Sequence, residues 1–239
     1  SYFSGNHPSK VSLEACYSKK ELPDKNSKWI TILKKTPTKA NSHHFFKIKN
    51  KSIFSHVRLN IFPDGGVARL RIYGSMDIKK KFGKKTFNLT SVLNGATPIV
   101  CNNEHFGRAE NILAPGIGKN MGDGWETRRS RGKNVDWLII KCAAPGKIKN
   151  IQIDTHHFKG NYPDRCSVQG AYIDRKISSK SIINNSKKWK FLLNKVKLFA
   201  NKKHNFKNKS MKNCKINYIK INIFPDGGIS RIRAFGKIV

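Results

Sequence analysis

The sequence predicts an all-β protein made of tandem duplicated jelly-roll β-sandwiches. Three observations carry this prediction: many short segments of alternating polarity, turns rich in Pro and Gly, and an internal repeat. The segment 60–74, NIFPDGGVARLRIYG, recurs at 222–236 as NIFPDGGISRIRAFG. The segment 3–17, FSGNHPSKVSLEACY, recurs at 158–172 as FKGNYPDRCSVQGAY. Because the copies lie 155 to 162 residues apart, the repeat indicates duplicated domains rather than a solenoid of short units.

The two copies are of unequal length. Nothing in residues 1–75 matches the stretch 101–155. We therefore expect residues 1–77 to form the back half of a first jelly-roll domain that is incomplete at its N-terminus. Residues 78–239 are expected to form a complete second domain. The strands that the first domain lacks would come from an upstream segment or from another chain.

Alternating polar and apolar residues predict strands on both sides of each Pro-Asp-Gly-Gly turn. In the first copy the alternation runs through 56–61 and resumes at 68–72, with the turn at 63–66 between them. The second copy repeats this pattern at 218–223 and 230–233. In such a turn Pro presets φ, Asp bonds to nearby backbone and Gly adopts a positive φ, so we expect one hairpin in each copy.

Two further strands are expected in the middle of the chain. Residues 136–141 and 148–154 are rich in Ile and Leu, and Ala144-Pro145-Gly146 separates them as a turn. The only weak candidate for a helix is the segment 186–199.

Composition excludes several classes of protein. Hydrophobic residues make up 38% and aromatic residues 10% of the 239 residues, which is too much core material for a disordered basic tail. No apolar run approaches the roughly 18 residues of a membrane helix, so we expect no membrane partner. The five cysteines form no CxxC pair, which argues against a disulfide framework or a zinc ribbon and fits a reducing, intracellular compartment.

The net charge of +34 is concentrated at the two ends of the chain. Residues 1–100 carry 19 basic and 5 acidic side chains, residues 101–174 carry 11 and 8, and residues 175–239 carry 18 and 1. A lysine-rich coding bias would give an excess everywhere. A surplus confined to the flanks favours contact with a polyanion.

The densest cluster of polar side chains is the segment 120–129, NMGDGWETRR. Its glycines allow a sharp bend, and Asp123 or Glu126 could act in general acid–base chemistry. Arg128 and Arg129 present planar donor forks that suit a carboxylate, a ureido oxygen or a phosphate. The alternative is a purely structural loop held together by Glu–Arg pairs.

Two other stretches could converge on this loop, namely 104–111 with His105 and 154–164 with His156. Three histidines with nearby carboxylates could bind a metal ion. However, His156 and His157 point to opposite faces of an extended chain, so we expect no metal site and no cofactor. The two Pro-Asp-Gly-Gly turns are interpreted as structural turns of a duplicated fold.

These motifs make the chain resemble the allantoicase family. The motifs are MGDGWETRR at 121–129, DTHHFKGNYPD at 154–164, HFGRAEN at 105–111 and HVRLNIFPDGGVARLRIYG at 56–74, the last with a drifted copy at 218–236. The resemblance covers nearly the whole chain. It implies duplicated jelly rolls of the galactose-binding-like type that hydrolyse allantoate to ureidoglycolate and urea in purine breakdown.

The resemblance also implies a set of roles. Such a hydrolysis needs a base that activates water, a proton donor to the leaving urea and a clamp for the substrate carboxylate. Arg128 or Arg129 would be the clamp. The acid–base pair would combine Glu126 or Asp123 with His105 or His156, and polar substrate contacts would come from two further side chains, Lys159 and Asn161.

Two functions remain open at this point, and the charge makes us favour a binding protein over a working allantoicase. In this reading the fold serves as a basic structural component of a ribonucleoprotein, with rRNA and neighbouring subunits as partners and the mitochondrial ribosome as the favoured assembly. The mitochondrial matrix is then the favoured compartment, with the cytoplasm as the alternative. An active allantoicase would instead be expected to form a homo-oligomer.

The RNA contacts of that reading would come from lysine-rich runs, which neutralise phosphates without reading sequence. Nearby aromatic residues (Phe82, Phe87, Trp189 and Phe206) could stack on unpaired bases, although core packing is the simpler role for Trp189. The lysines concerned are Lys79, Lys80, Lys81, Lys84, Lys85, Lys187, Lys188, Lys190, Lys202, Lys203, Lys207 and Lys209, with Lys47, Lys49 and Lys51 as further candidates.

Overall fold

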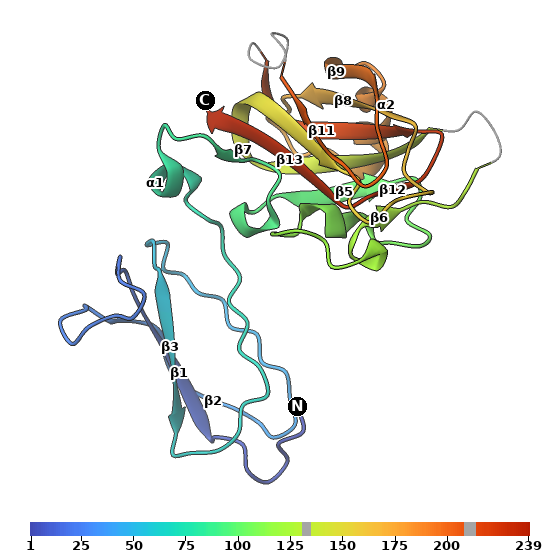
Figure 1. The fold of residues 1–239 in the computed structure, drawn as a ribbon. Helices are drawn as coiled ribbons and strands as arrows, with labels where there is room; N and C mark the ends of the chain where they lie inside the picture. The colour runs from blue at the N-terminus through green and yellow to red at the C-terminus, as the bar shows by residue number, and fades with distance from the viewer. Residues whose placement is uncertain (131–134, 208–213) are drawn as a thin grey trace. The chain divides into compact units, whose positions relative to one another are not determined.

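The computed structural model describes residues 1–130, 135–207 and 214–239, which fall into two compact units (Figure 1). Unit 1 is Ser1–Gly74 and unit 2 is Ser75–Val239. Nearly all regular structure is β-strand in both units, which confirms the all-β prediction. None of the described helices is long and apolar enough to cross a membrane.

Unit 1 is a three-stranded antiparallel sheet with the order β2-β1-β3. Its strands are β1 (Lys10–Cys16), β2 (Ile30–Pro37) and β3 (His56–Phe62). The central strand β1 carries most of the buried residues of the unit, among them Leu13 and Ala15. Strand β3 has only β1 as a neighbour among the described strands, so one of its edges is open.

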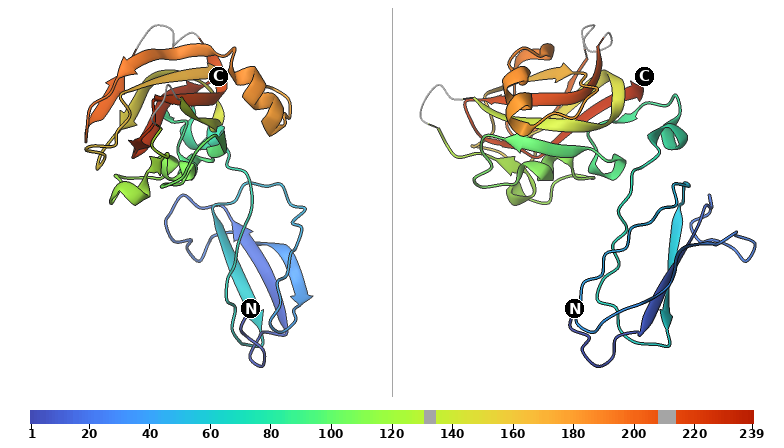
Figure 2. Two further views of the ribbon diagram at one scale, coloured as in Figure 1. Left: turned by 90° about the vertical axis from the view of Figure 1, so that its right-hand side faces the viewer. Right: turned by 180° about the vertical axis from the view of Figure 1, so that it is seen from behind.

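Unit 2 is a β-sandwich with one long strand at its centre, β7 (Asp136–Asp154), visible as the long yellow ribbon in Figure 2. Strand β7 pairs with β11 from Asp136 to Lys147 and with β13 from Gly146 to Asp154. The same strand therefore belongs to one layer in its first half and to the other layer in its second half.

The first layer of unit 2 has the order β5-β7-β11-β8-β9, and the second has the order β10-β7-β13-β4. All of these pairs are antiparallel. The strands are β4 (Phe87–Asn88), β5 (Thr97–Cys101), β8 (Arg165–Ala171), β9 (Lys190–Lys197), β10 (Lys203–Phe206), β11 (Lys215–Phe224) and β13 (Arg231–Ile238). A separate short pair joins β6 (Trp125–Glu126) to β12 (Gly228–Ile229).

The core of unit 2 lies between the two layers and combines side chains from both halves of β7. Leu138 and Ile151 of β7 pack there with Ile221 of β11 and Ile232 of β13, and all four are fully buried. On the outer face of the first layer Ile139, from β7, forms a second cluster with the helix α2. The helices are α1 (Ile78–Phe82) and α2 (Ser179–Ser186), with 3-10 turns η1 (Val92–Asn94), η2 (Ala109–Leu113) and η3 (Met121–Asp123).

Three local expectations were wrong. The Pro-Asp-Gly-Gly turn of the second copy closes no hairpin, because β11 and β13 both pair with β7, which lies between them. Residues 144–146 do not interrupt β7, since Pro145 stands where the strand passes between layers. The helix at 186–199 is absent, because α2 ends at Ser186 and 190–197 forms strand β9.

The predicted strand at 68–72 in the first copy is not formed either, although the structure describes every residue of it. Its counterpart in the second copy becomes strand β13 by pairing with β7 on one edge and β4 on the other. No described strand pairs with 68–72. The same sequence pattern thus gives a strand only where a neighbouring strand supplies hydrogen bonds.

Candidate functional site

Glu126 lies at a hollow of unit 2, at the end of the short strand β6. The preceding residue, Trp125, is fully buried, and its indole Nε1 donates a hydrogen bond of 2.8 Å to the carbonyl of Asn103. This anchor places the half-buried Glu126 at a hollow of about 460 Å³. The hollow is lined by Phe106, Glu126, Thr127, Arg129, Ser130, Gly160, Asn161, Tyr162, Asp164, Pro225, Asp226 and Gly227.

The carboxylate of Glu126 is held by the side chain of Asn161. The Asn161 amide Nδ2 donates a hydrogen bond to Glu126 Oε1. The backbone of Glu126 is fixed as well, because its N–H donates to the Gly107 carbonyl at 3.1 Å and its carbonyl accepts from the Gly107 N–H at 3.2 Å. The carboxylate is therefore preorganised by contacts from two separate loops.

The Pro-Asp-Gly-Gly turn of the second copy forms one wall of this hollow. Asp226 Oδ2 accepts a hydrogen bond of 2.6 Å from the backbone N–H of Ser130. The N–H of Gly227, whose φ is +125°, donates to Thr127 Oγ1 at 3.1 Å. Our interpretation of this motif as a purely structural turn missed Asp226. The signal that could have revealed it was the exact repetition of an acidic residue in both copies.

Gly228, the last residue of that turn, must be glycine for a steric reason. A Cβ on Gly228 would lie 1.8 Å from the ring of Phe158, which is fully buried. The Gly228 N–H donates to the Asn161 carbonyl at 2.8 Å. Close approach of these two segments thus brings Asn161 to Glu126.

Asp123 is close to Glu126 in sequence but is committed to an ion pair. Its Oδ2 lies 2.7 Å from Nη2 of Arg231, whose side chain is 4% exposed. The hydrogen bond from Arg231, assisted by one from the Lys119 N–H, holds the pKa of Asp123 below its usual range. Asp123 therefore fixes the loop in its ionised form, and it does not line the hollow.

The predicted histidines lie outside the lining of the hollow. The rings of His156 and His157 contact each other at an interplanar angle of 49°, with centroids 4.0 Å apart, and His157 Nε2 lies 2.8 Å from the Gly118 carbonyl. The ring of His105 packs edge-on against the ring of Phe106, with centroids 4.5 Å apart, and Phe106 lines the hollow. His105 is therefore the predicted acid–base histidine with a direct link to this site.

The other predicted substrate contacts divide in the same way. Arg129 and Asn161 line the hollow, whereas Arg128 and Lys159 do not. The backbone N–H of Arg128 donates to Asn103 Oδ1 at 3.2 Å. The structure thus brings together Glu126, Arg129 and Asn161.

Metal and thiol chemistry find little support in the part of the chain that the structure describes. No group of three or more His, Cys, Asp or Glu residues there could hold a metal ion. All five cysteines are free thiols. Burial raises the pKa of Cys142 and of Cys166 to about 12, so neither is a thiolate at neutral pH.

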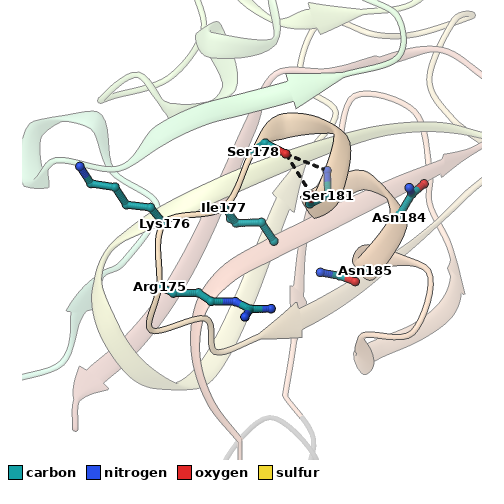
Figure 3. A pocket seen from close by; sticks show the side chains of 7 residues that line it. All are labelled: Arg175, Lys176, Ile177, Ser178, Ser181, Asn184 and Asn185. Atoms are coloured by element: carbon teal, nitrogen blue, oxygen red, sulfur yellow. Dashed lines mark hydrogen bonds between the residues drawn. The ribbon is translucent and has the colours of Figure 1, made fainter.

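A second hollow of about 420 Å³ lies at the start of α2, on the far side of the first layer from the core (Figure 3). Ser178 caps the helix by accepting a hydrogen bond of 3.3 Å from the Ser181 N–H. Arg175 and Lys176 at its rim are exposed. Since the cap already occupies the helix N-terminus, this hollow offers no built binding site.

Comparison with known proteins gives the family. The family profile described as "Allantoicase repeat" matches residues 1–77 and 87–239. The chain belongs to the allantoicase family. A "Probable allantoicase" of Pseudomonas fluorescens (strain SBW25) is 45% identical over 244 aligned residues, which cover 100% of this chain and 72% of that protein. "Probable allantoicase 1" of Burkholderia mallei is 42% identical over 240 residues.

The fold agrees with that assignment. The crystal structure of allantoicase from Saccharomyces cerevisiae matches with a TM-score of 0.69 and 34% sequence identity. The match covers 99% of this chain and 70% of the yeast chain. Both the family resemblance and the jelly-roll fold expected from the sequence are confirmed.

The prediction of an RNA-binding component of a mitochondrial ribosome was wrong. Relatives that are 42–45% identical across essentially the whole chain are named as probable allantoicases. The aromatic residues expected to stack on bases serve the core instead. Trp189 and Phe87 are buried, and Phe82 stacks on Phe87 with ring centroids 4.1 Å apart.

The lysine runs assigned to RNA contacts are exposed side chains of turns and of helix and strand ends, where a surplus of charge affects solubility and association without specifying a function. Lys209 lies outside the described residues. The described members are Lys79, Lys80, Lys81, Lys84, Lys85, Lys187, Lys188, Lys190, Lys202, Lys203 and Lys207.

Proposed function

We propose that the chain is an allantoicase that hydrolyses allantoate to ureidoglycolate and urea at the hollow around Glu126. The observation that carries the proposal is the convergence of a carboxylate, an amide and a guanidinium on one hollow in a chain of this family. The volume of about 460 Å³ falls in the range of roughly 300–1,000 Å³ typical of small-molecule sites.

The proposed reaction replaces a C–N bond by a C–O bond. A water molecule attacks the central carbon of allantoate, which bears the carboxylate and two ureido groups, and the bond to one ureido nitrogen breaks. Glu126 takes a proton from the water, and the leaving nitrogen gains a proton, so that urea departs as a neutral molecule. No oxidation or reduction takes place.

The neighbours of Glu126 suit this role. Asn161 donates to one carboxylate oxygen, Oε1, which leaves Oε2 to accept a proton from water. Arg129 can hold the substrate carboxylate with a bidentate pair of hydrogen bonds. Asp226 fixes the Ser130 N–H and with it the loop that carries Arg129. Among the predicted histidines, His105 is the proton donor that we favour, because it contacts Phe106 of the lining.

The test is urea release from allantoate by the purified chain and by Glu126→Gln. Loss of a general base lowers kcat by about 10²–10⁴-fold, so Glu126→Gln is expected to lose nearly all turnover while its urea-unfolding curve stays unchanged. Glu110→Gln is the matched control, since Glu110 has a 60%-exposed side chain outside the hollow, and it should keep full activity. Full turnover by Glu126→Gln would refute the assignment of the base.

A further inference from the structure

Among the described residues, three carboxylates line the hollow of this strongly basic chain, and two of them already have a role. Glu126 is the proposed base. Asp164 is paired with Lys197 and with Arg165, whose Nε lies 3.5 Å away. The hydrogen bond from Lys197 holds the pKa of Asp164 below its usual range. The third carboxylate, that of Asp226, is the one whose role is still open.

One oxygen of Asp226 is used inside the protein and the other is not. Oδ2 accepts the hydrogen bond of 2.6 Å from the Ser130 N–H. In the part of the chain that the structure describes, Oδ1 has no hydrogen-bond partner and no salt bridge includes Asp226. The side chain is half-buried, and a partly dehydrated carboxylate gains free energy when N–H groups reach it. Oδ1 is therefore an acceptor that a ligand in the hollow can satisfy.

The turn that carries Asp226 is held firmly against its neighbours. Thr127, which follows Glu126, donates its N–H to the Gly227 carbonyl at 3.2 Å and accepts from the Gly227 N–H at 3.1 Å through Oγ1. A Cβ on Gly227, whose φ is +125°, would lie 2.6 Å from the Asn161 carbonyl. Asp226 therefore keeps a fixed place beside the strand that ends in Glu126.

The charges at the hollow orient a substrate that has both an anionic and a donor-rich part. Allantoate carries one carboxylate and two ureido groups, and each ureido group offers three N–H donors. Its carboxylate is attracted by Arg129 and repelled by Asp226, and both of these residues line the hollow. The substrate carboxylate therefore lies at Arg129, and a ureido group lies at Asp226.

The two ureido groups of allantoate need different partners. The group that departs as urea must receive a proton, for which His105 is the favoured donor. The group that stays on the product keeps its protons and needs only acceptors for its N–H groups. Oδ1 of Asp226 suits this second group.

We propose that Asp226 determines specificity, because its Oδ1 accepts hydrogen bonds from the N–H groups of the ureido group that stays on the product. This inference rests on the proposed function. It names the contact by which the hollow distinguishes a ureido group from an acyl group of the same size.

The test measures, by calorimetry, the binding of two small anions to the full chain. N-carbamoylglycine carries one carboxylate and one ureido group, and N-acetylglycine has a methyl group in place of the terminal NH2. Because the two anions have nearly the same size and the same charge, the ratio of their affinities reports the contact of the terminal NH2. We expect wild type to bind N-carbamoylglycine about tenfold more tightly or better, as for a hydrogen bond to a charged group.

Asp226→Asn reverses the polarity of one atom and keeps the other. The Asn oxygen still accepts from the Ser130 N–H, whereas the NH2 group takes the place of Oδ1 and donates. The variant should keep the urea-unfolding curve of wild type and bind the two anions with equal affinity. Loss of the negative charge shifts both affinities alike, so it does not alter their ratio. Asp64→Asn is the matched control, since Asp64 is the exposed counterpart in the first copy of the turn, and it should keep the full preference.

Turnover of allantoate gives a second measurement. A hydrogen bond to a group that does not react is present in both the bound substrate and the transition state, so its loss raises KM and leaves kcat nearly unchanged. Asp226→Asn should therefore raise KM about tenfold or more, whereas Glu126→Gln lowers kcat. A distorted site would lower kcat as well.

The proposal is overturned if wild type binds neither anion, if it binds both equally, or if Asp226→Asn keeps the preference. A fall in kcat without a rise in KM would also overturn it, since Asp226 would then act through the loop of Ser130. The proposed function fails by a different result. A chain that prefers N-carbamoylglycine but releases no urea from allantoate would keep the ureido contact and lose the assignment as a hydrolase.

Discussion

The two units are alike in their loops and different in one strand. In unit 1 the Tyr2 N–H donates to Asn41 Oδ1 at 2.9 Å, and in unit 2 the His157 N–H donates to Asn201 Oδ1 at the same distance. All four residues have positive φ values, between 43° and 73°. Such agreement at strained positions shows that the local sequence determines these loops without help from β7.

The segments after the turns differ because their hydrogen bonds are not local. Residues 231–238 are a strand through pairing with β7 and β4, whereas 68–74 has the same alternation and no regular structure. Alternation tells which side chains would face a core, but a strand exists only when a neighbour accepts and donates its backbone hydrogen bonds. The comparison therefore separates what a segment encodes from what its neighbour contributes.

The difference in burial after the two turns is tested most sharply by shortening the side chain at the same repeat position in each unit. Ile232→Ala should lower the free energy of unfolding of unit 2 by about 2–5 kcal/mol, because it leaves a cavity in a closed core. Leu70→Ala shortens a side chain that is 46% exposed. It should therefore change the free energy of unfolding of unit 1 by less than about 0.5 kcal/mol. Hydrogen exchange is measured at increasing urea concentrations on peptides from each unit. It therefore gives the free energy of unfolding of the two units separately. Equal losses in the two units would show that 68–74 is packed after all.

Substituting the arginine that precedes each of these positions should change the free energy of unfolding by a smaller amount, through one specific hydrogen bond. Arg231→Leu breaks the bond to Asp123 and should cost roughly 1.5–3 kcal/mol, the usual range for a hydrogen bond to a charged group. Arg69→Leu removes an exposed guanidinium and should be neutral within about 0.5 kcal/mol. The midpoint of urea unfolding measures both variants. Arg231→Lys, which keeps the charge but loses the planar fork, should fall between wild type and Arg231→Leu.

The sequence allowed the fold class and much of the candidate site to be predicted, because both are encoded in contiguous motifs. The repeat indicated two jelly rolls, and the segment 120–129 drew attention to Glu126 and Arg129. The fully buried Trp125, next to Glu126, explains why this short motif positions its carboxylate. Motif-level chemistry of this kind depends on residues that are neighbours in the chain.

What could not be predicted depends on pairing between distant segments. The hairpin prediction failed because β7, some 70 to 90 residues before β11 and β13, lies between them. The contact between Asp226 and Ser130 was missed for the same reason, since it spans 96 residues. Net charge misled the functional reading most, because surface lysines are compatible with many functions. The comparison with relatives overturned the RNA-binding reading.

The smallest predicted effect concerns a pair of residues that the two copies do not share. Asn60 of unit 1 donates to Glu14 Oε2 at 2.8 Å, and Asn222 of unit 2 donates to Oε1 of Gln169, the counterpart of Glu14, at 3.1 Å. The bond from Asn60, followed by that from Arg58, holds the pKa of Glu14 below its usual range. A carboxyl with a lowered pKa stabilises the fold above its unfolded value of about 4.3 and loses this contribution as the pH falls through the folded value.

Unit 1 should therefore show an acid-dependent step at this position, and unit 2 should not. The carboxyl carbon of Glu14, followed by NMR from pH 6 down to pH 2, should titrate below the usual range of a glutamate side chain. In Asn60→Ala the titration of Glu14 should move upward, because the bond that contributes most to its lowered pKa is gone. Glu14→Gln should make this site of unit 1 as insensitive to acid as Gln169 is in unit 2. An unchanged Glu14 titration in Asn60→Ala would assign the effect to Arg58 instead, and Arg58→Ala would then produce the shift.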